Sequence, residues 1–166
     1  MRGYWTAAAI TGAVLILTGC EAAEAPAPVE DAPILLKAGQ WTMDRTITGY
    51  NTPDITAEDY ARMVGTKSTA EVCLTVDAKG QPDPNALAGA EGEECTYKEP
   101  SIRKGRFIAN LTCKAGKGTS ELVLEGNYKA DSMTLGVSMT KMEGGNAVLR
   151  TTHDLTAKRT GECKAR

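Results

Sequence analysis

Apolar and polar side chains alternate along most of the second half of this chain. Five runs have this period of two, covering residues 95–103, 106–113, 119–128, 133–142 and 147–158. Short connections that mostly contain glycine separate them, at residues 104–105, 115–118, 129–132 and 143–146. Alternating runs joined by such turns are typical of hairpins, so the pattern predicts an antiparallel meander.

The first half of the chain is less regular. Trp41, Met43, Arg45 and Ile47 alternate with threonine and aspartate, which predicts a half-buried strand, and residues 70–76 predict a second one. Between them, Thr56 with an acidic residue three positions later is a variant of the capping box and predicts a short helix over residues 56–65. Residues 77–94 are typical of a loop, with room for one helical turn at Asp83-Pro84.

The alternation gives the predicted sheet one apolar face. The other face carries mostly threonine, lysine, glutamate and asparagine, as in antiparallel sheets with one solvated side. We therefore expect a mainly β protein, an antiparallel meander sheet or partial barrel with one short helix, stapled by disulfides. Closure into a partial barrel, the short helix or a bound ligand would have to cover the apolar face. Its predicted members are Phe107, Ala109, Leu111, Cys113, Leu122, Leu124, Tyr128, Met133, Leu135, Val137, Met139, Leu149, Leu155 and Ala157.

The amino-terminal residues have the layout of a secretory signal. Arg2 supplies a positive charge, and a mainly apolar stretch follows over residues 7–17. This stretch is shorter than the roughly 20 residues that a membrane-spanning helix needs. We interpret residues 1–19 as a signal peptide.

The end of this segment, Leu17-Thr18-Gly19-Cys20, resembles the lipobox of bacterial lipoproteins. The resemblance implies that Cys20 receives a diacylglyceryl group, that the bond before it is cut, and that a fatty acid such as palmitate is added to the new amino group. An ordinary signal that happens to contain a cysteine is the alternative. For a lipoprotein, the partner of Cys20 is the lipid bilayer, and the chain faces the periplasm. Glu21, in place of an aspartate, favours the outer membrane over the inner membrane.

Residues 20–33 differ in composition from the rest. They are rich in alanine, proline and glutamate, and Val29 is their only large apolar residue. Such a segment buries too little apolar surface to offset its ordering entropy, so we expect a lipidated flexible tether. Residues 34–166 then form a single antiparallel β domain, because they provide enough chain for one domain only.

Charge and aromatic content exclude some classes of partner. The whole chain has a net charge of −2, and loss of residues 1–19 removes one of 19 basic residues and none of 21 acidic ones, which leaves −3. An acidic chain is a poor partner for nucleic acid. Aromatic residues make up 5% of the chain, which argues against large stacking platforms for sugars.

Four cysteines remain if Cys20 carries lipid. An even number in an exported chain predicts two disulfides, and four thiols allow three pairings. We favour Cys95 with Cys113, since they flank the Lys104-Gly105 hairpin, which leaves Cys73 with Cys163. The spacing contains no C-x-x-C pair, so structural disulfides are favoured over redox or zinc chemistry.

Several segments together resemble a known family. They are Gly39-Gln40-Trp41, Val72-Cys73-Leu74, Glu94-Cys95-Thr96-Tyr97, Leu111-Thr112-Cys113 and Gly161-Glu162-Cys163. Their order and spacing resemble the proteobacterial envelope family known as domain of unknown function 3617, over residues 36–163. The resemblance implies a periplasm-facing β domain with this cysteine framework, and it carries no catalytic residues over.

No constellation of residues indicates catalysis, a cofactor or a metal. His153 could activate a nucleophile, but no G-x-S-x-G pattern accompanies it, and we expect it at a sheet margin. The glycines at 116 and 118 lack phosphate-loop spacing and predict a hairpin. Methionines 133 and 139 are expected in the core and Met142 on the opposite face of the sheet. This arrangement argues against a copper site formed by the three thioethers. Glutamates 91, 93 and 94 predict a solvated loop or a weak calcium contact.

Two classes of function follow from these patterns. The first is a non-enzymatic binding or interaction module of the cell envelope, which holds an apolar small ligand or docks an envelope protein on the apolar face of its sheet. The alternative is an unrecognised hydrolase or transferase of the envelope that uses His153 or the acidic loop. We favour the first, because the residue constellations of catalysis are missing.

Overall fold

A computed structural model describes residues 33–164 of the chain. Cys20, the predicted signal peptide and the predicted tether up to residue 32 lie outside the described residues. The described residues belong to one compact unit, Ala32–Arg166.

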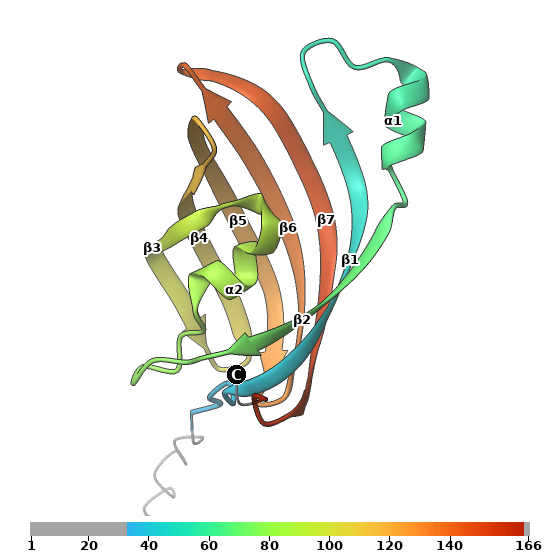
Figure 1. The fold of residues 1–166 in the computed structure, drawn as a ribbon. Coiled ribbons are helices and arrows are strands. Elements are labelled where there is room, and N and C mark those ends of the chain that lie inside the picture. The colour runs from blue at the N-terminus through green and yellow to red at the C-terminus, as the bar shows by residue number, and fades with distance from the viewer. Residues whose placement is uncertain (1–32, 165–166) are drawn as a thin grey trace, which may run out of the picture. The chain divides into compact units, whose positions relative to one another are not determined.

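Seven strands and two short helices make up the fold (Figure 1). The strands are β1 (Gly39–Asn51), β2 (Lys67–Leu74), β3 (Glu93–Arg103), β4 (Arg106–Ala115), β5 (Gly118–Lys129), β6 (Ser132–Glu143) and β7 (Asn146–Gly161). The helices are α1 (Ala57–Met63) and α2 (Pro84–Ala88), and the 3-10 turn Gly89–Glu91 follows α2 directly. All strand pairs are antiparallel, in the order β2-β1-β7-β6-β5-β4-β3.

This sheet confirms the predicted meander. The five alternating runs are strands β3 to β7, and their ends differ from the predicted ones by at most three residues. Burial follows the alternation closely: in β4, Phe107, Ala109 and Leu111 are buried, while Asn110 between them is exposed. The predicted Lys104-Gly105 turn joins β3 to β4.

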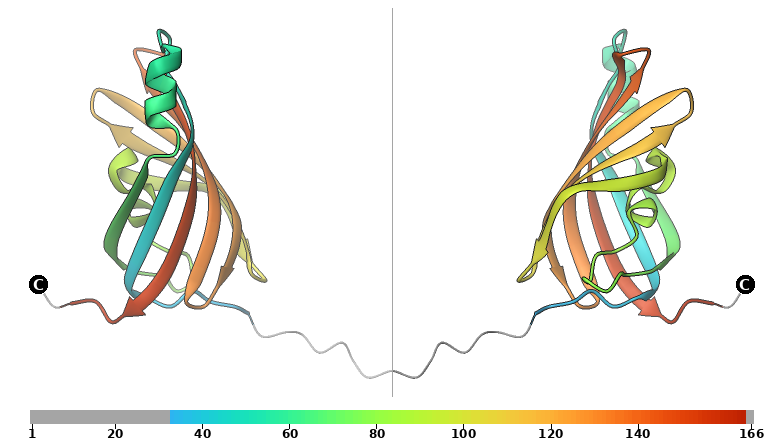
Figure 2. Two further views of the ribbon diagram at one scale, coloured as in Figure 1. Left: turned by 90° about the vertical axis from the view of Figure 1, so that its right-hand side faces the viewer. Right: turned by 90° about the vertical axis from the view of Figure 1, so that its left-hand side faces the viewer.

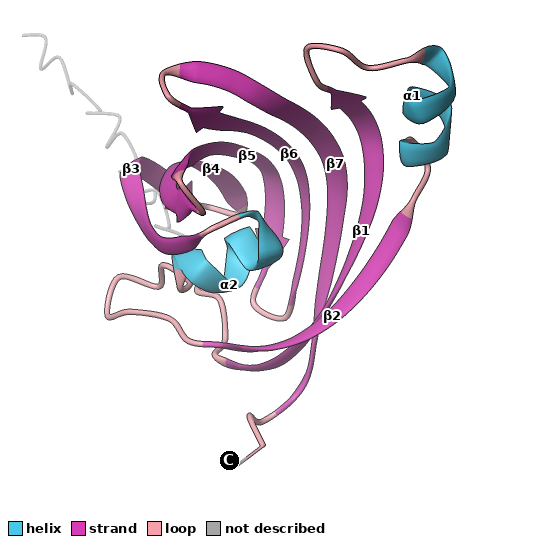
Figure 3. Ribbon diagram, turned by 45° about the horizontal axis from the view of Figure 1, so that its top comes forward, coloured by secondary structure: helices cyan, strands magenta, loops and turns pink. Residues whose placement is uncertain are grey.

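The sheet curves strongly, and α2 lies in its hollow (Figures 2 and 3). The apolar face is the concave one, because its side chains form one core cluster with Leu87 and Ala88 of α2. A bulge in β1 between Ile47 and Gly49 keeps this face continuous, because it pairs Tyr50 with Thr151 after Ile47 has paired with His153. One inserted residue on one strand therefore moves the following side chain to the concave side.

Two helices replace the single short helix that the sequence predicts. The predicted one is α1, which Thr56 caps by accepting a hydrogen bond from the Asp59 backbone at 3.1 Å, but α1 contributes no buried residue. The concave face is covered instead by α2, which begins at Asp83-Pro84, where the sequence predicts room for one helical turn within a loop. Leu87 and Ala88 of α2 are 1% and 0% exposed and lie in the core, and Figure 3 shows α2 within the hollow of the sheet.

Two disulfides link the strands, one within a hairpin and one between elements that are distant in the chain. Cys95 on β3 bonds Cys113 on β4, with Cα atoms 4.0 Å apart. Cys73 on β2 bonds Cys163 just after β7, with Cα atoms 5.3 Å apart. These are the two pairs that the position of the Lys104-Gly105 hairpin favours.

The strands give the domain two ends. At one end the described chain begins, β1 starts, β2 and β7 finish, and the β3–β4 and β5–β6 turns lie; we call this the tether end. At the other end, which we call the far end, lie α1 and the β4–β5 and β6–β7 turns.

Candidate functional site

A cavity of about 510 Å³ opens on the concave side of the sheet toward the far end. The segment that follows α2 forms one wall of the cavity, and the ends of β4, β6 and β7 form the others. The lining residues are Gly89, Ala90, Glu91, Gly92, Glu93, Lys114, Ala115, Gly116, Met139, Lys141 and Leu149. The cavity therefore combines apolar side chains with charged ones of both signs.

The wall formed by residues 89–93 is packed tightly against the sheet. The hydroxyl of Ser120, which is fully buried on β5, donates a hydrogen bond to the backbone carbonyl of Glu91 at 2.7 Å. A Cβ atom at Gly92 would lie 2.5 Å from the Cβ atom of Cys113, so only glycine lets the segment come this close. The wall is consequently held by β4 and β5.

Behind this wall lies the side chain of Arg45, from the concave side of β1. Its Nη2 atom donates a hydrogen bond of 2.6 Å to the carbonyl of Leu87 on α2. A Cβ atom at Gly89 would lie 2.5 Å from Nη1 of the same guanidinium. The Nε atom of Arg45 is buried and has no hydrogen-bond partner among the described residues.

Glu91 is the carboxylate that influences the charge of Arg45, but the two side chains form no direct ion pair. Burial lowers the pKa of Arg45, and the negative charge of Glu91 opposes this shift. Burial likewise raises the pKa of Glu91, which Arg45 opposes. No ion pair within residues 33–164 joins these two side chains at 4 Å or less. A guanidinium remains charged at any physiological pH. The Nε–H of Arg45 therefore stays a hydrogen-bond donor without a partner inside the fold.

His153 and Thr151 extend this polar region along β7. His153 is 4% exposed and Thr151 is 7% exposed, and the Oγ1 atom of Thr151 has no hydrogen-bond partner among the described residues. The expected position of His153 at a sheet margin is wrong, because β7 lies between β1 and β6 inside the sheet. Burial first, and then Arg45, lower the pKa of His153 to about 4, while Asp154 opposes them. The imidazole is therefore neutral near pH 7.

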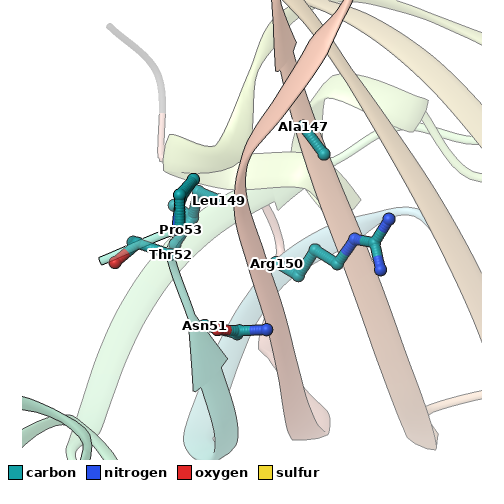
Figure 4. A pocket seen from close by; sticks show the side chains of 6 residues that line it. All are labelled: Asn51, Thr52, Pro53, Ala147, Leu149 and Arg150. Carbon is teal, nitrogen blue, oxygen red and sulfur yellow. The ribbon is translucent and has the colours of Figure 1, made fainter. Parts of the chain in front are cut away.

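Two smaller hollows border the same end of the domain. One, of about 250 Å³, lies where β1 ends and β7 begins (Figure 4). In that view Leu149 and Arg150, neighbours on β7, point to opposite sides of the strand. The other, of about 350 Å³, includes Ile55 and Tyr60 near α1. Leu149 lines both the first of these hollows and the main cavity, so the openings are adjacent.

The candidate residues that the sequence suggested are dispersed in the fold. Methionines 133 and 139 are buried in the core, and Met142 lies on the other face, as their positions in β6 predict. Residues 116–117 form the β4–β5 turn, the predicted hairpin. Glu94 pairs with Lys114 at 2.6 Å. Of the three glutamates, Glu91 differs from the predicted solvated loop, because it is partly buried and lies within the electrostatic influence of Arg45.

Arg45, Thr151 and Gly89 are site residues that sequence patterns alone did not indicate. The one available signal was the position of Arg45, which shares a strand face with Trp41 and Met43 and so places a charge where an apolar side chain is expected. Nothing in the sequence connects Arg45 to residues 87–91, because that contact depends on the path of α2 across the sheet.

Two further findings concern only the part of the chain that the structure describes. No three His, Cys, Asp or Glu side chains within residues 33–164 are grouped so that they could hold a metal ion. Within the same residues, no helix has the length and apolar character needed to cross a bilayer.

Comparison with known proteins places the chain in a family. No curated protein and no solved structure matches it significantly. The model of one family, described as "Protein of unknown function (DUF3617)", matches residues 36–163, which include both disulfides and every strand. The chain therefore belongs to the DUF3617 family.

Proposed function

We propose that the mature protein is a lipid-anchored binding module of the bacterial envelope. Acyl groups on Cys20 hold it to a membrane, preferably the outer one, and the β domain stands in the periplasm on a flexible tether. The domain binds a small molecule that carries a carboxylate, in the cavity between β6, β7 and residues 89–93, and it does not alter that molecule chemically.

The proposed anchor is supported by the sequence. A charged residue, an apolar stretch and Leu17-Thr18-Gly19-Cys20 follow one another in the order that export and lipidation require. Two disulfides in the folded domain suit an oxidising compartment such as the periplasm. One acyl chain binds a membrane only marginally, whereas the two or three chains of a lipoprotein make the attachment durable.

The single observation that carries the binding proposal is the unpaired Nε atom of Arg45. A buried donor without a partner costs roughly 1 to 3 kcal/mol, and buried polar groups in folded proteins are nearly always hydrogen-bonded. Thr151 adds a second buried polar atom without a partner, its Oγ1, on the neighbouring strand. A ligand oxygen placed against the guanidinium would supply the acceptor that the Nε–H lacks.

The charge and size of the region define the class of ligand. An arginine that lacks a direct ion pair favours an anionic acceptor, and its planar fork matches a carboxylate. A volume of about 510 Å³ is within the usual range for small-molecule sites. Met139 and Leu149 line the cavity and suit a short apolar portion of the ligand.

The ligand proposed here occupies a smaller part of the sheet than the apolar ligand expected from the sequence. That ligand would occupy the concave face of the sheet, but the protein's own side chains fill most of that face. Trp41, Phe107 and Leu87 are each 0% or 1% exposed there. We therefore place the ligand beside the 89–93 segment and not under the whole meander.

A photo-crosslinking amino acid at position 149 tests the binding proposal. Introduced in the full chain in living cells, it should form a small-molecule adduct, detected as a mass increase of the purified protein. The control is the same substitution at Val123, which is 42% exposed and belongs to the outward-facing positions of β5. Arg45→Gln should abolish the adduct at position 149. Equal adducts at both positions, or none at 149, would refute a ligand at this site.

The anchor is tested separately by Cys20→Ser. The wild-type chain should fractionate with membranes and carry added fatty acyl mass on Cys20. The serine variant should lose that mass. A wild-type protein that remains water-soluble, with no added mass, would refute the anchor while leaving the binding site open to test.

A further inference from the structure

We propose that the tether end of the domain docks on an anionic lipid surface, so that the far end with its cavity faces away from the membrane. The proposal concerns charges and apolar side chains of the described domain. The choice of a membrane as partner rests in part on the proposed anchor, whereas the binding itself can be tested without Cys20 and without the ligand proposed above.

The two ends of the domain carry opposite charge. At the tether end, the connections and adjoining residues contain seven lysines or arginines and four acidic residues. These segments are 33–39, 74–84, 103–106, 129–132 and 161–164. At the far end, the corresponding segments contain three basic residues and six acidic ones. These segments are 51–67, 89–93, 115–118 and 143–146. The chain is mildly acidic as a whole, so this asymmetry separates the charges along the strands.

The basic side chains of the tether end are available to a partner. All seven are exposed: Lys37, Lys79, Arg103, Lys104, Arg106, Lys129 and Lys164. Of these, Lys164 lies 3.8 Å from a carboxylate oxygen of Glu71. Backbone contacts bring several of these segments together. The Lys37 N–H donates to the carbonyl of Ala130 at 2.8 Å, and the Tyr128 N–H donates to the carbonyl of Gly105 at 2.8 Å. The cations therefore form one surface, not separate points along the chain.

Two exposed apolar side chains lie on the same surface. Ile34 is 40% exposed and Leu35 is 52% exposed. They are fixed in place, because the Tyr128 hydroxyl donates to the carbonyl of Ile34 at 2.9 Å and Leu35 packs over Gly80. Apolar side chains among exposed cations are the combination that binds the interface of an anionic bilayer.

Chain connectivity favours a membrane as the occupant of this surface. The described chain begins at Pro33, on the tether end, so whatever the preceding residues are attached to is held near the basic surface. A nucleic acid or an acidic protein would also be attracted by the charge. Neither accounts for Ile34 and Leu35 beside the point where the chain enters the domain.

The test uses the chain from residue 21 to residue 166, which lacks Cys20 and contains the whole core and both disulfides. Circular dichroism first verifies that the chain is folded. Sedimentation with vesicles then measures partitioning, with phosphatidylcholine alone or mixed with phosphatidylglycerol. We expect binding only to the mixed vesicles, and its release at about 1 M salt, where the Debye length is about 3 Å.

Matched variants locate the surface. Arg106→Gln with Lys129→Gln should weaken partitioning about 25-fold, since each basic residue near an anionic surface contributes about 1 kcal/mol, or about fivefold. Lys67→Gln with Lys117→Gln removes two exposed cations at the far end and should leave partitioning unchanged. Ile34→Ser with Leu35→Ser should weaken it, whereas Val123→Ser, also an exposed apolar residue, should not.

Three results of the vesicle experiments would overturn the proposal. They are absence of binding to the mixed vesicles, equal binding to vesicles without phosphatidylglycerol, and equal loss for the tether-end and far-end lysine and arginine variants. Retention on an immobilised polyanion without any vesicle binding would likewise overturn it and would assign the surface to an acidic polymer.

Discussion

Gly89 lies directly against the guanidinium of Arg45, where any side chain would collide with it. Its φ angle of +60° is also one that residues with a side chain seldom adopt. The turn after α2 and the position of Arg45 therefore depend on each other. This contact joins residues that are 44 positions apart in the chain and belong to the two sides of the candidate site.

Gly89→Ala should destabilise the domain by about 2 kcal/mol or more, because it combines a strained backbone with displacement of Arg45. Urea denaturation followed by circular dichroism measures the change. Gly144→Ala is the matched control, since Gly144 has a φ of +56° and a Cβ atom there would have no neighbour within 4 Å. An equal loss in the two variants would show that the contact with Arg45 adds nothing to the backbone strain.

Arg45→Met separates binding from stability. Arg45 is partly buried and incompletely paired, and replacing such a charge by an apolar side chain of similar length is often neutral or stabilising. We expect the free energy of unfolding to stay within about 1 kcal/mol of wild type, while the ligand adduct at position 149 disappears. A loss of stability of about 3 kcal/mol or more would indicate that the guanidinium is a structural group, and would weaken its assignment to a ligand.

Stability should fall as the pH decreases from about 6.5 to about 4, because of His153. Its pKa is about 4 in the folded domain and 6.5 in the unfolded chain, so in this range the unfolded chain binds a proton that the folded domain does not. Glu91 acts in the opposite sense near the acidic limit, since its pKa is raised in the fold.

The pH effect is measured by urea denaturation across this range in wild type and in His153→Gln. The variant has no imidazole to protonate, so its loss of stability between pH 6.5 and 4 should be smaller. Parallel curves for the two proteins would mean that another group causes the acid sensitivity.

The two disulfides should contribute unequally to stability. In the chain-entropy model, the Cys73–Cys163 bond closes a separation of 90 residues and contributes about 4 to 5 kcal/mol, whereas the Cys95–Cys113 bond spans 18 residues and contributes about 3 kcal/mol. Cys73 is exposed, so Cys73→Ser with Cys163→Ser should leave the native circular dichroism spectrum unchanged while lowering the urea midpoint.

The second pair provides the comparison. Cys95 and Cys113 are 6% and 2% exposed, so Cys95→Ala with Cys113→Ala also removes packed sulfur atoms from the core. Its cost should exceed the entropic value through this loss of packing. An unchanged urea midpoint after removal of the Cys73–Cys163 bond would contradict the chain-entropy model, because that bond would then not restrict the unfolded chain.

The sheet could be predicted from the sequence because apolar and polar residues alternate within each strand. In β4 and β6 nearly every second residue is buried, and the turns between strands are short. The cover of the sheet could not be predicted in the same way. Five residues of α2 are too few to show a helical period, and their burial depends on crossing the sheet to meet Arg45 on β1.

The candidate site was less predictable than the fold. His153 is the single histidine of the sequence, but its place on a central strand follows from β1 pairing with β7, a contact between the two ends of the domain's sequence. Arg45 could be seen as a charge among apolar positions. Glu91 and Gly89 gave no signal, because their role arises from a turn that has no regular pattern.

The position of β1 in the sheet also determines how the domain responds to force. β1 is the first strand after the point where the described chain begins, and it is hydrogen-bonded to β2 on one side and to β7 on the other. Tension that enters at Pro33 runs along β1, so it loads both hydrogen-bond ladders in shear, with many bonds resisting together. A partner that pulls on the far end would thus meet the mechanically strongest direction of this sheet.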